Sequence, residues 1–526
     1  MSIRAFLAVL LAGLMGAGPA FSQVFGPISP TRPICLDTAP DVDPRRSLFV
    51  TELDVVQSAI SLEDVMTKLV ADSGDPNLTP DLLWAQWWDT QNQGPGLGLG
   101  ANCDDAVNAQ GEATINRFPI QCPRNEGTEI NVDPFTPDTG SFYEPIALVN
   151  RFDLAPTDGA NCGEYRVIFA RHSGATNPLH RNLVIFEAVL PNPSPGCGLA
   201  GCRGIAKFWT GLSRVDDPAL RADALRRFYL EGFPSRGIPP VIHARHFGPG
   251  TGQVRTNQFM SGSELRRWQL REFKLAQLCD GATGSCAFQF VPVTVKTNPF
   301  GELFDDTTGS PRAAKFQRHY LTQVKNLSKA DVNGFFAEVP DRFNAGQSNS
   351  QGDENDYTEH FVPGGRFEAA LEQRLQLLGV RLTPEHLVRR SMALSCAGCH
   401  QLSNNLPESD LGGIKWPRSL GFVQVSEALT DTNDGSEHFR ISPALEDVFS
   451  PHREAVFEKY LNKVSCSGCP VPVIAAMEPP VLPLLESIEI PEGAAVVEVS
   501  EEVRRLDTEL KAGGAAETVG GPRPVH

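Results

Sequence analysis

The sequence predicts an α+β protein, in which a large β-containing N-terminal region is followed by a helical C-terminal segment. Two observations along the 526 residues support this class. Short strand-like runs bounded by Gly and Pro dominate from about residue 144 to 300, whereas amphipathic helical spacing dominates after residue 366. Strands and helices are grouped instead of alternating regularly, which argues against a βαβ fold.

Residues 1–22 are expected to form a secretory signal peptide. Arg4 supplies the positive charge, residues 5–18 are apolar, and residues 20–22 have the small-x-small pattern of a cleavage site. No cysteine follows that site, so a lipoprotein anchor is not expected. No later run reaches the length of about 18 apolar residues that a transmembrane helix needs. We therefore expect a periplasmic or secreted protein with no transmembrane segment.

The region 23–345 is expected to contain helices first and then strands. Ser61 opens a capping-box pattern, and Thr79 followed by proline marks a second helix start. On this second helix Trp84 and Trp88 are four residues apart, so both should face the core. Further on, strands are expected at 146–149, 165–169, 183–189, 287–295 and neighbouring runs, with helices at 206–212 and 219–230.

The composition restricts the partners and suggests disulfides. The net charge of −17, from 46 basic and 63 acidic residues, argues against nucleic acid and anionic membrane surfaces. In an exported chain the 12 cysteines are expected to pair, although spacing does not determine their connectivity. Proximity along the chain suggests Cys103–Cys122, Cys197–Cys202 and Cys279–Cys286, which leaves Cys35 and Cys162 for each other.

The C-terminal part is expected to be helical. Residues 345–365 are polar and Gly-rich, and we interpret them as a loop or domain boundary. The following segment, 366–477, should hold helices at 367–378, 384–400 and 451–464. Residues 478–526 begin Pro-rich and continue acidic and rich in Ala and Gly, so they are expected to form a disordered acidic tail.

The most informative motif is Cys-Ala-Gly-Cys-His at 396–400. Cys396 and Cys399 are three residues apart, so on a helical turn both thiols lie on one side, where each can form a thioether bond to a haem vinyl group. His400 follows directly and can serve as the proximal iron ligand. Thr383 should cap the preceding helix, whose apolar stripe then continues into the two cysteines.

This motif resembles the attachment site of c-type cytochromes. The resemblance covers the five motif residues and extends at most to the helical segment, which would then be cytochrome c-like. It implies one haem c bound to Cys396 and Cys399, with His400 on the iron. The implied function is electron transfer or haem-dependent oxidoreduction, with a redox protein or a small molecule as partner. A simple carrier and an enzyme are both compatible with the motif.

The second axial position of such a haem is not evident from the sequence. Common single-haem c-type cytochromes take a Met from a loop before the last helix, but no Met lies between His400 and the helix expected near residue 451. His438 falls in this interval, and Met477 lies beyond that helix. The sixth ligand is therefore His438, Met477 or a displaceable water, and the polar, turn-like stretch at 431–436 favours the open position.

A second Cys-x-x-Cys pair keeps an alternative open. Cys466 and Cys469 repeat the spacing of the first pair, but Pro470 stands where a haem site needs His. The two pairs could meet as a four-thiolate zinc site or as disulfides. The chain would then be a non-catalytic exported binding or structural protein. Gly-x-Ser-x-Gly, Walker and His-Glu-x-x-His motifs are absent from the sequence, so it offers no hydrolase signature.

Overall fold

The computed structural model describes residues 42–98, 100–261, 268–279 and 286–463. Some of the predictions fall outside the described residues. They concern the signal peptide at 1–22, Cys35, the second Cys-x-x-Cys pair at 466–469, Met477 and the tail at 478–526.

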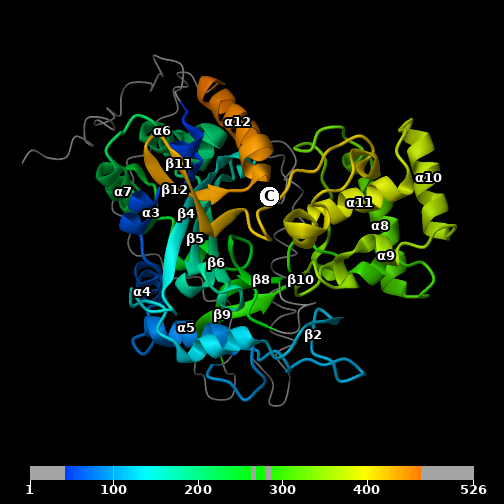
Figure 1. The fold of residues 1–526 in the computed structure, drawn as a ribbon, viewed down its shortest axis with the longest axis horizontal. Coiled ribbons are helices and arrows are strands. Elements are labelled where there is room, and N and C mark those ends of the chain that lie inside the picture. The colour runs from blue at the N-terminus through cyan, green and yellow to red at the C-terminus, as the bar shows by residue number, and fades with distance from the viewer. Residues whose placement is uncertain (1–41, 99, 262–267, 280–285, 464–526) are drawn as a thin grey trace, which may run out of the picture.

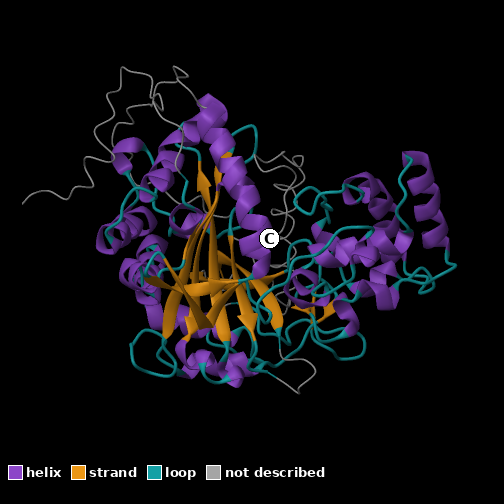
Figure 2. Cartoon of the chain, turned by 45° about the horizontal axis from the view of Figure 1, so that its top comes forward, coloured by secondary structure: helices purple, strands orange, loops and turns teal. Residues whose placement is uncertain are grey.

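An antiparallel sheet of eight strands forms the centre of the protein (Figures 1 and 2). Its strand order is β1-β4-β5-β6-β7-β8-β10, and β9 also pairs with β8. From β4 to β9 each strand pairs with the next one along the chain, as in a β-meander. The strands of this sheet are β1 Phe49–Val50, β4 Tyr143–Arg151, β5 Asn161–Arg171, β6 Asn182–Pro191, β7 Gln253–Gln258, β8 Gln269–Cys279, β9 Cys286–Val293 and β10 Ser348–Asn349.

The two faces of the sheet differ in chemistry because side chains alternate along each strand. On one face Tyr165, Phe186 and Phe273 are fully buried. The Trp87 ring lies 6.1 Å from that of Phe186 and 5.5 Å from that of Phe273, and the Trp209 ring lies 5.9 Å from that of Tyr165, between centroids. Helices that carry these tryptophans therefore cover an apolar face, while the opposite face carries charged side chains.

Helices are spread through the chain. The backbone N–H of Asp64 donates to Ser61 Oγ at 3.0 Å, and that of Leu82 donates to Thr79 Oγ1 at 3.2 Å, so both predicted helix starts are confirmed. Within the described ranges no helix is long and apolar enough to cross a membrane. The helices are α2 Pro44–Ser47, α3 Leu53–Ala59, α4 Leu62–Ser73, α5 Pro80–Asp89, α6 Arg203–Leu212, α7 Pro218–Arg226, α8 Pro311–Leu327, α9 Tyr357–His360, α10 Arg366–Leu378, α11 Pro384–Leu394 and α12 Ser450–Lys463.

The described residues form two large hydrophobic cores. The first lies on the sheet and draws its residues from 42–295, from 423–461 and from the motif residues Cys396 and Ala397. The second is formed mainly by α8, α10 and α11 and their loops, between residues 300 and 416. Figure 1 shows these helices as a group beside the sheet. The chain thus leaves the sheet after β9, builds the helical core with one return to the sheet at β10, and rejoins the sheet core with residues 423–461.

The prediction of an all-helical, cytochrome c-like segment at 366–477 is wrong. It contains a hairpin of two antiparallel strands, β11 Val425–Asn433 and β12 Ser436–Ile441. The turn residues Asp434 and Gly435 both have positive φ, 50° and 83°, as a type I′ turn requires. Beyond Glu427, β11 is mostly exposed and runs through Ala428 and Leu429 into four polar residues, so no apolar alternation marks it as a strand. Within the predicted loop at 345–365, β10 also joins the sheet.

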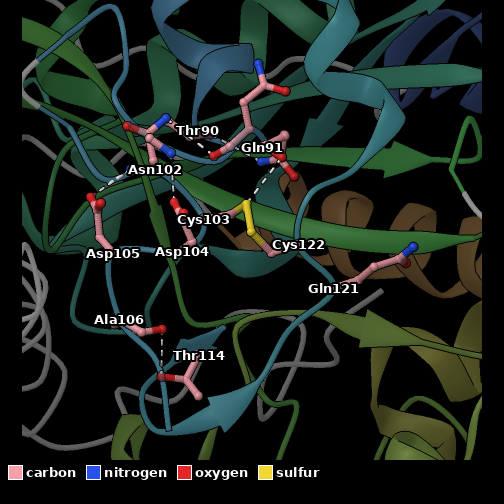
Figure 3. The surroundings of a disulfide bond; sticks show 12 residues. Thr90, Gln91, Asn102, Cys103, Asp104, Asp105, Ala106, Thr114, Gln121 and Cys122 are labelled. Atoms are coloured by element: carbon pink, nitrogen blue, oxygen red, sulfur yellow. Dashed lines mark hydrogen bonds between the residues drawn. A yellow bond between two sulfur atoms is a disulfide. The ribbon is translucent and has the colours of Figure 1, made fainter. Parts of the chain in front are cut away.

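Three disulfides have both of their cysteines within the described residues. Cys103–Cys122 and Cys279–Cys286 confirm two predictions, and Figure 3 shows the first of them. The predicted pair Cys197–Cys202 is wrong, as is the pairing of Cys162 with Cys35, because Cys162 is bonded to Cys202. This bond joins the start of β5 to the residue before α6, and such a link between distant segments leaves no trace in local spacing. Cys197 is itself disulfide-bonded, to a partner other than Cys202. The β2 Thr114–Ile115 and β3 Phe118–Pro119 hairpin lies in the loop that Cys103–Cys122 closes.

The lengths of the loops closed by two of these disulfides predict which one contributes more to the free energy of unfolding. Cys162–Cys202 closes a separation of 40 residues and Cys279–Cys286 one of 7. In the chain-entropy account, removing the first pair by double Cys→Ser substitution costs roughly 4 kcal/mol and removing the second costs roughly 2 kcal/mol. Chemical denaturation of the two variants beside the parent protein measures both values. Equal losses, or a larger loss for the short loop, would contradict this reasoning.

Candidate functional site

The motif at 396–400 forms a short helical turn that is separate from the preceding helix α11. Helix α11 begins at the predicted cap, with Thr383 Oγ1 accepting from the backbone N–H of His386 at 3.2 Å, but it ends at Leu394. The predicted continuous helix 384–400 is therefore interrupted, because Ser395 has extended backbone angles. Ser395 then restarts the helical turn, since its Oγ accepts from Gly398 N at 3.0 Å and its carbonyl accepts from Cys399 N at 2.9 Å.

Glycine is required at position 398 for steric reasons. A Cβ atom there would lie 1.7 Å from the carbonyl oxygen of Met392, a separation that no side chain tolerates. The new turn is thus pressed against the last turn of α11. A bond from Ala397 N to Ser348 Oγ, 2.9 Å long, fastens it to β10 at the same time. These contacts fix the position of the motif relative to the sheet.

Both motif cysteines are free, buried thiols. Cys396 is 5% exposed and belongs to the sheet core, whereas Cys399 is 3% exposed and belongs to the helical core. The motif therefore lies where the two cores meet. Gln424 Nε2 donates to Cys399 Sγ at 3.5 Å, from the segment that enters β11. The thiols are close enough for the charge of one to influence the other.

The imidazole of His400 is held in one tautomer. Its Nδ1 donates to the carbonyl oxygen of Phe422 over 2.5 Å, so Nε2 keeps its lone pair. The ring stacks on Trp268, with centroids 5.2 Å apart and planes inclined by 27°. Trp268 is fully buried, and its Nε1 donates to Asn257 Oδ1 at 3.1 Å. A histidine oriented in this way, through a backbone carbonyl on the other nitrogen, is preorganised for binding a metal.

Charged side chains of the sheet lie next to the motif. Arg166 and Glu187 are opposite each other on β5 and β6, and their side chains are 3.2 Å apart. Arg255 on β7 contacts Glu187 at 3.3 Å and Glu272 on β8 at 3.1 Å. These residues share the face on which Trp268 meets His400, because even-numbered positions of β8 point to that face. Cations and anions alternate along this row, so each buried charge has an opposite neighbour.

The surroundings keep the motif residues neutral. Burial raises the pKa of the Cys396 thiol to about 11, against an opposing effect of Arg255. Burial also raises the pKa of Cys399, and the neighbouring Cys396 adds to this. The pKa of His400 falls to about 4, chiefly because its ring is removed from water, although the bond to Phe422 opposes the shift. At neutral pH the site thus presents two thiols and an imidazole with a free lone pair.

The structure does not bring His438 to this site. His438 lies on β12, 4% exposed, with its Nδ1 3.5 Å from Thr51 Oγ1 and its backbone bridged to Glu52. The ring of His400, by contrast, contacts Trp268 and the carbonyl of Phe422. Burial lowers the pKa of His438, with Glu52 opposing. The described residues contain no group of three or more His, Cys, Asp or Glu that could hold a metal ion.

Several residues of this site were not found by sequence reasoning. Trp268 directly precedes β8, Ser348 lies on β10 and Phe422 lies in the loop before β11. Nothing in their local sequence marks them, because each contact depends on tertiary folding. The one usable signal is that β7 is buried throughout although every residue except Val254 is polar, which shows that this strand must meet polar partners.

Comparison with protein-family models, with curated proteins and with solved structures finds no match to this chain. The site is therefore judged on its own geometry and chemistry.

The thiol environment predicts low reactivity in the folded, haem-free protein. With a pKa of about 11, only roughly one thousandth of Cys396 is thiolate at pH 8. Alkylation by iodoacetamide, followed by peptide mass spectrometry, should leave both motif cysteines unlabelled, and the rate at Cys396 should rise as pH approaches 11. Unfolded protein is the control, because both thiols should then react readily. Rapid labelling of either motif cysteine in the folded protein at pH 7 would contradict this prediction of low reactivity.

Proposed function

We propose that this chain is an exported c-type haem protein, with one haem bound covalently to Cys396 and Cys399 and His400 as the proximal ligand. The observation that carries the proposal is the combination of two adjacent free thiols with a neighbouring imidazole whose Nδ1 is bonded to a carbonyl. That arrangement leaves Nε2 for iron. The three disulfides are compatible with export, since disulfides persist in oxidising compartments.

The residues present fit this cofactor. When bound, haem c would supply a one-electron redox centre. Cys396 and Cys399 would anchor it at the junction of the two cores, and the Phe422 carbonyl would keep the His400 ring oriented. The Trp268 ring restricts movement of the imidazole. Most of the adjacent sheet charges are buried and paired, which provides a fixed electrostatic environment for a redox group.

Electron transfer and haem-dependent oxidoreduction both remain within this proposal. The choice depends on the sixth position of the iron, which is open, or filled by His438 or Met477. The contacts of His438 with Thr51 and Glu52 favour an open or water-filled position. An open position suits reaction with a small-molecule substrate, whereas a filled one suits exchange with a redox protein.

The alternative is a non-catalytic exported binding or structural protein. In it the pair Cys396 and Cys399 would be cross-linked to the second pair, by disulfides or by zinc. Both motif thiols are free, which supports haem over the disulfide form of this alternative and is equally compatible with zinc. The experiments below separate the two functions.

Covalent haem is tested by mass. Protein expressed with a cytochrome c maturation system should carry the added mass of one haem and give a pyridine haemochrome spectrum. The double variant Cys396→Ser/Cys399→Ser should lose both. Cys279→Ser/Cys286→Ser, which removes a disulfide elsewhere, is the matched control and should stay red. A colourless parent protein of unmodified mass, with zinc or with no free thiol, would establish the alternative.

The sixth position is tested by His438→Ala. Because His438 contacts Thr51 and not the motif, we expect no change in the optical spectrum of the oxidised or reduced protein. Reduced protein should bind carbon monoxide readily in parent and variant alike. Met477→Ala, examined in the same way, should also leave the optical spectrum and carbon monoxide binding unchanged. A change from low-spin to high-spin in either variant would identify that residue as the ligand and overturn the open position.

A further inference from the structure

Arg271 on β8 is buried without a partner. Its side chain is 0% exposed, and none of its three guanidinium nitrogens has a hydrogen-bond partner in the structure of the described residues. Burying a charged group that is neither paired nor hydrogen-bonded costs several kcal/mol. Such a guanidinium therefore points to an occupant that supplies both charge and acceptor atoms.

Polar groups surround this guanidinium on the sheet. Thr256 on β7 lies directly opposite Arg271, and the next cross-strand pair on the same face is Gln258 with Gln269. The amide oxygens of Gln258 and Gln269 also lack partners. Their nitrogens are engaged, because Gln258 Nε2 donates to Thr256 Oγ1 and Gln269 Nε2 donates to Gln121 Oε1, both at 3.1 Å, so the two free oxygens can only accept hydrogen bonds. The unsatisfied groups are thus adjacent in register and form one polar patch, which continues to Asn182 opposite Gln258 on β6.

The two carboxylates whose charge acts on Arg271, Glu126 and Glu354, are already engaged. Glu126 accepts from Arg124 through both of its oxygens, at 3.1 and 2.9 Å, and also from the backbone N–H of Met260 at 2.7 Å. Glu354 accepts from Gln347 at 3.1 and 3.0 Å. Burial and the like charge of Arg124 lower the pKa of Arg271 to about 9. The charge on Arg271 is thus poorly compensated by the protein alone.

We propose that Arg271 anchors an enclosed binding site for a small monovalent carboxylate. A carboxylate accepts two parallel bonds from a guanidinium, which would satisfy the fork of Arg271. One unpaired guanidinium balances one negative charge, so a monovalent anion suits it better than a divalent oxyanion. Ordered water is the competing explanation, because water can also satisfy buried polar groups.

This site is separate from the proposed haem site. Arg271 lies on the same face of β8 as Phe273, which contacts Trp87. Glu272 and Trp268 occupy the opposite face, next to the motif. The inference therefore does not depend on the proposed function, and its test uses no haem signal.

The first measurement uses the unmodified chain. Since the guanidinium is enclosed, a carboxylate taken up during folding should remain bound during purification. Denaturing the protein and analysing the released small molecules by mass spectrometry should recover about one carboxylic acid per chain. Protein purified without such acids should show a melting temperature that rises with sodium acetate and not with sodium chloride at equal ionic strength. No recovered acid, together with equal effects of the two salts, would overturn the proposal in favour of water.

Variants assign the effect to Arg271. Arg271→Met should abolish the response to acetate, and without acetate it should be at least as stable as the parent because an uncompensated buried charge is gone. Arg390→Met is the matched control. Arg390 is equally buried, but its nitrogens donate to the carbonyls of Leu411, Leu327 and Lys329. This control should lose stability yet keep the response to acetate. An acetate response that survives in Arg271→Met would place the anion elsewhere and refute the assignment.

Discussion

The buried row of charges on β5 to β8 is the interaction on which the arrangement of the rest depends. Arg166, Glu187, Arg255 and Glu272 lie side by side on one face of the central sheet. Removing one member of such a network typically costs about 3–5 kcal/mol, because its partner is left buried and unpaired. A sheet face of this kind cannot be covered by an apolar helix. It needs a covering segment that brings polar groups of its own.

That covering segment is the motif turn with its neighbours. Trp268 presents its indole N–H to Asn257, and Ser348 accepts from the backbone of Ala397. The motif turn also belongs to both hydrophobic cores, through Cys396 on one side and Cys399 on the other. A group attached to these two thiols would therefore contact both the sheet core and the helical core. The position of the motif is thus a consequence of how the two halves of the molecule are joined.

Helix starts and strands that depend on neighbouring residues could be predicted from the sequence, whereas contacts between distant segments could not. Helix starts at Ser61, Thr79 and Thr383 follow from capping chemistry within three residues, and each is observed. The strand runs in the N-terminal region follow from their apolar and β-branched residues. The β11–β12 hairpin was missed because its strands lack regular apolar alternation, although Asp434-Gly435 is a strong turn signal. For the site, the spacing identified the motif residues, but Trp268 and Phe422 are distant in sequence and meet His400 only in the folded chain.

The return of the chain to its beginning also determines how this protein can fold. Thr51 and Glu52, at the start of α3, meet His438 on β12, and Phe152 packs its ring 4.4 Å from Tyr460 on α12. The sheet core is therefore incomplete until nearly all of the described chain has been synthesised. Contacts of such large sequence separation make folding slow, because long loops must close before these contacts are gained. A chain with this topology stays unfolded, and so accessible to proteins that act on unfolded polypeptides, for longer than one in which each half folds alone.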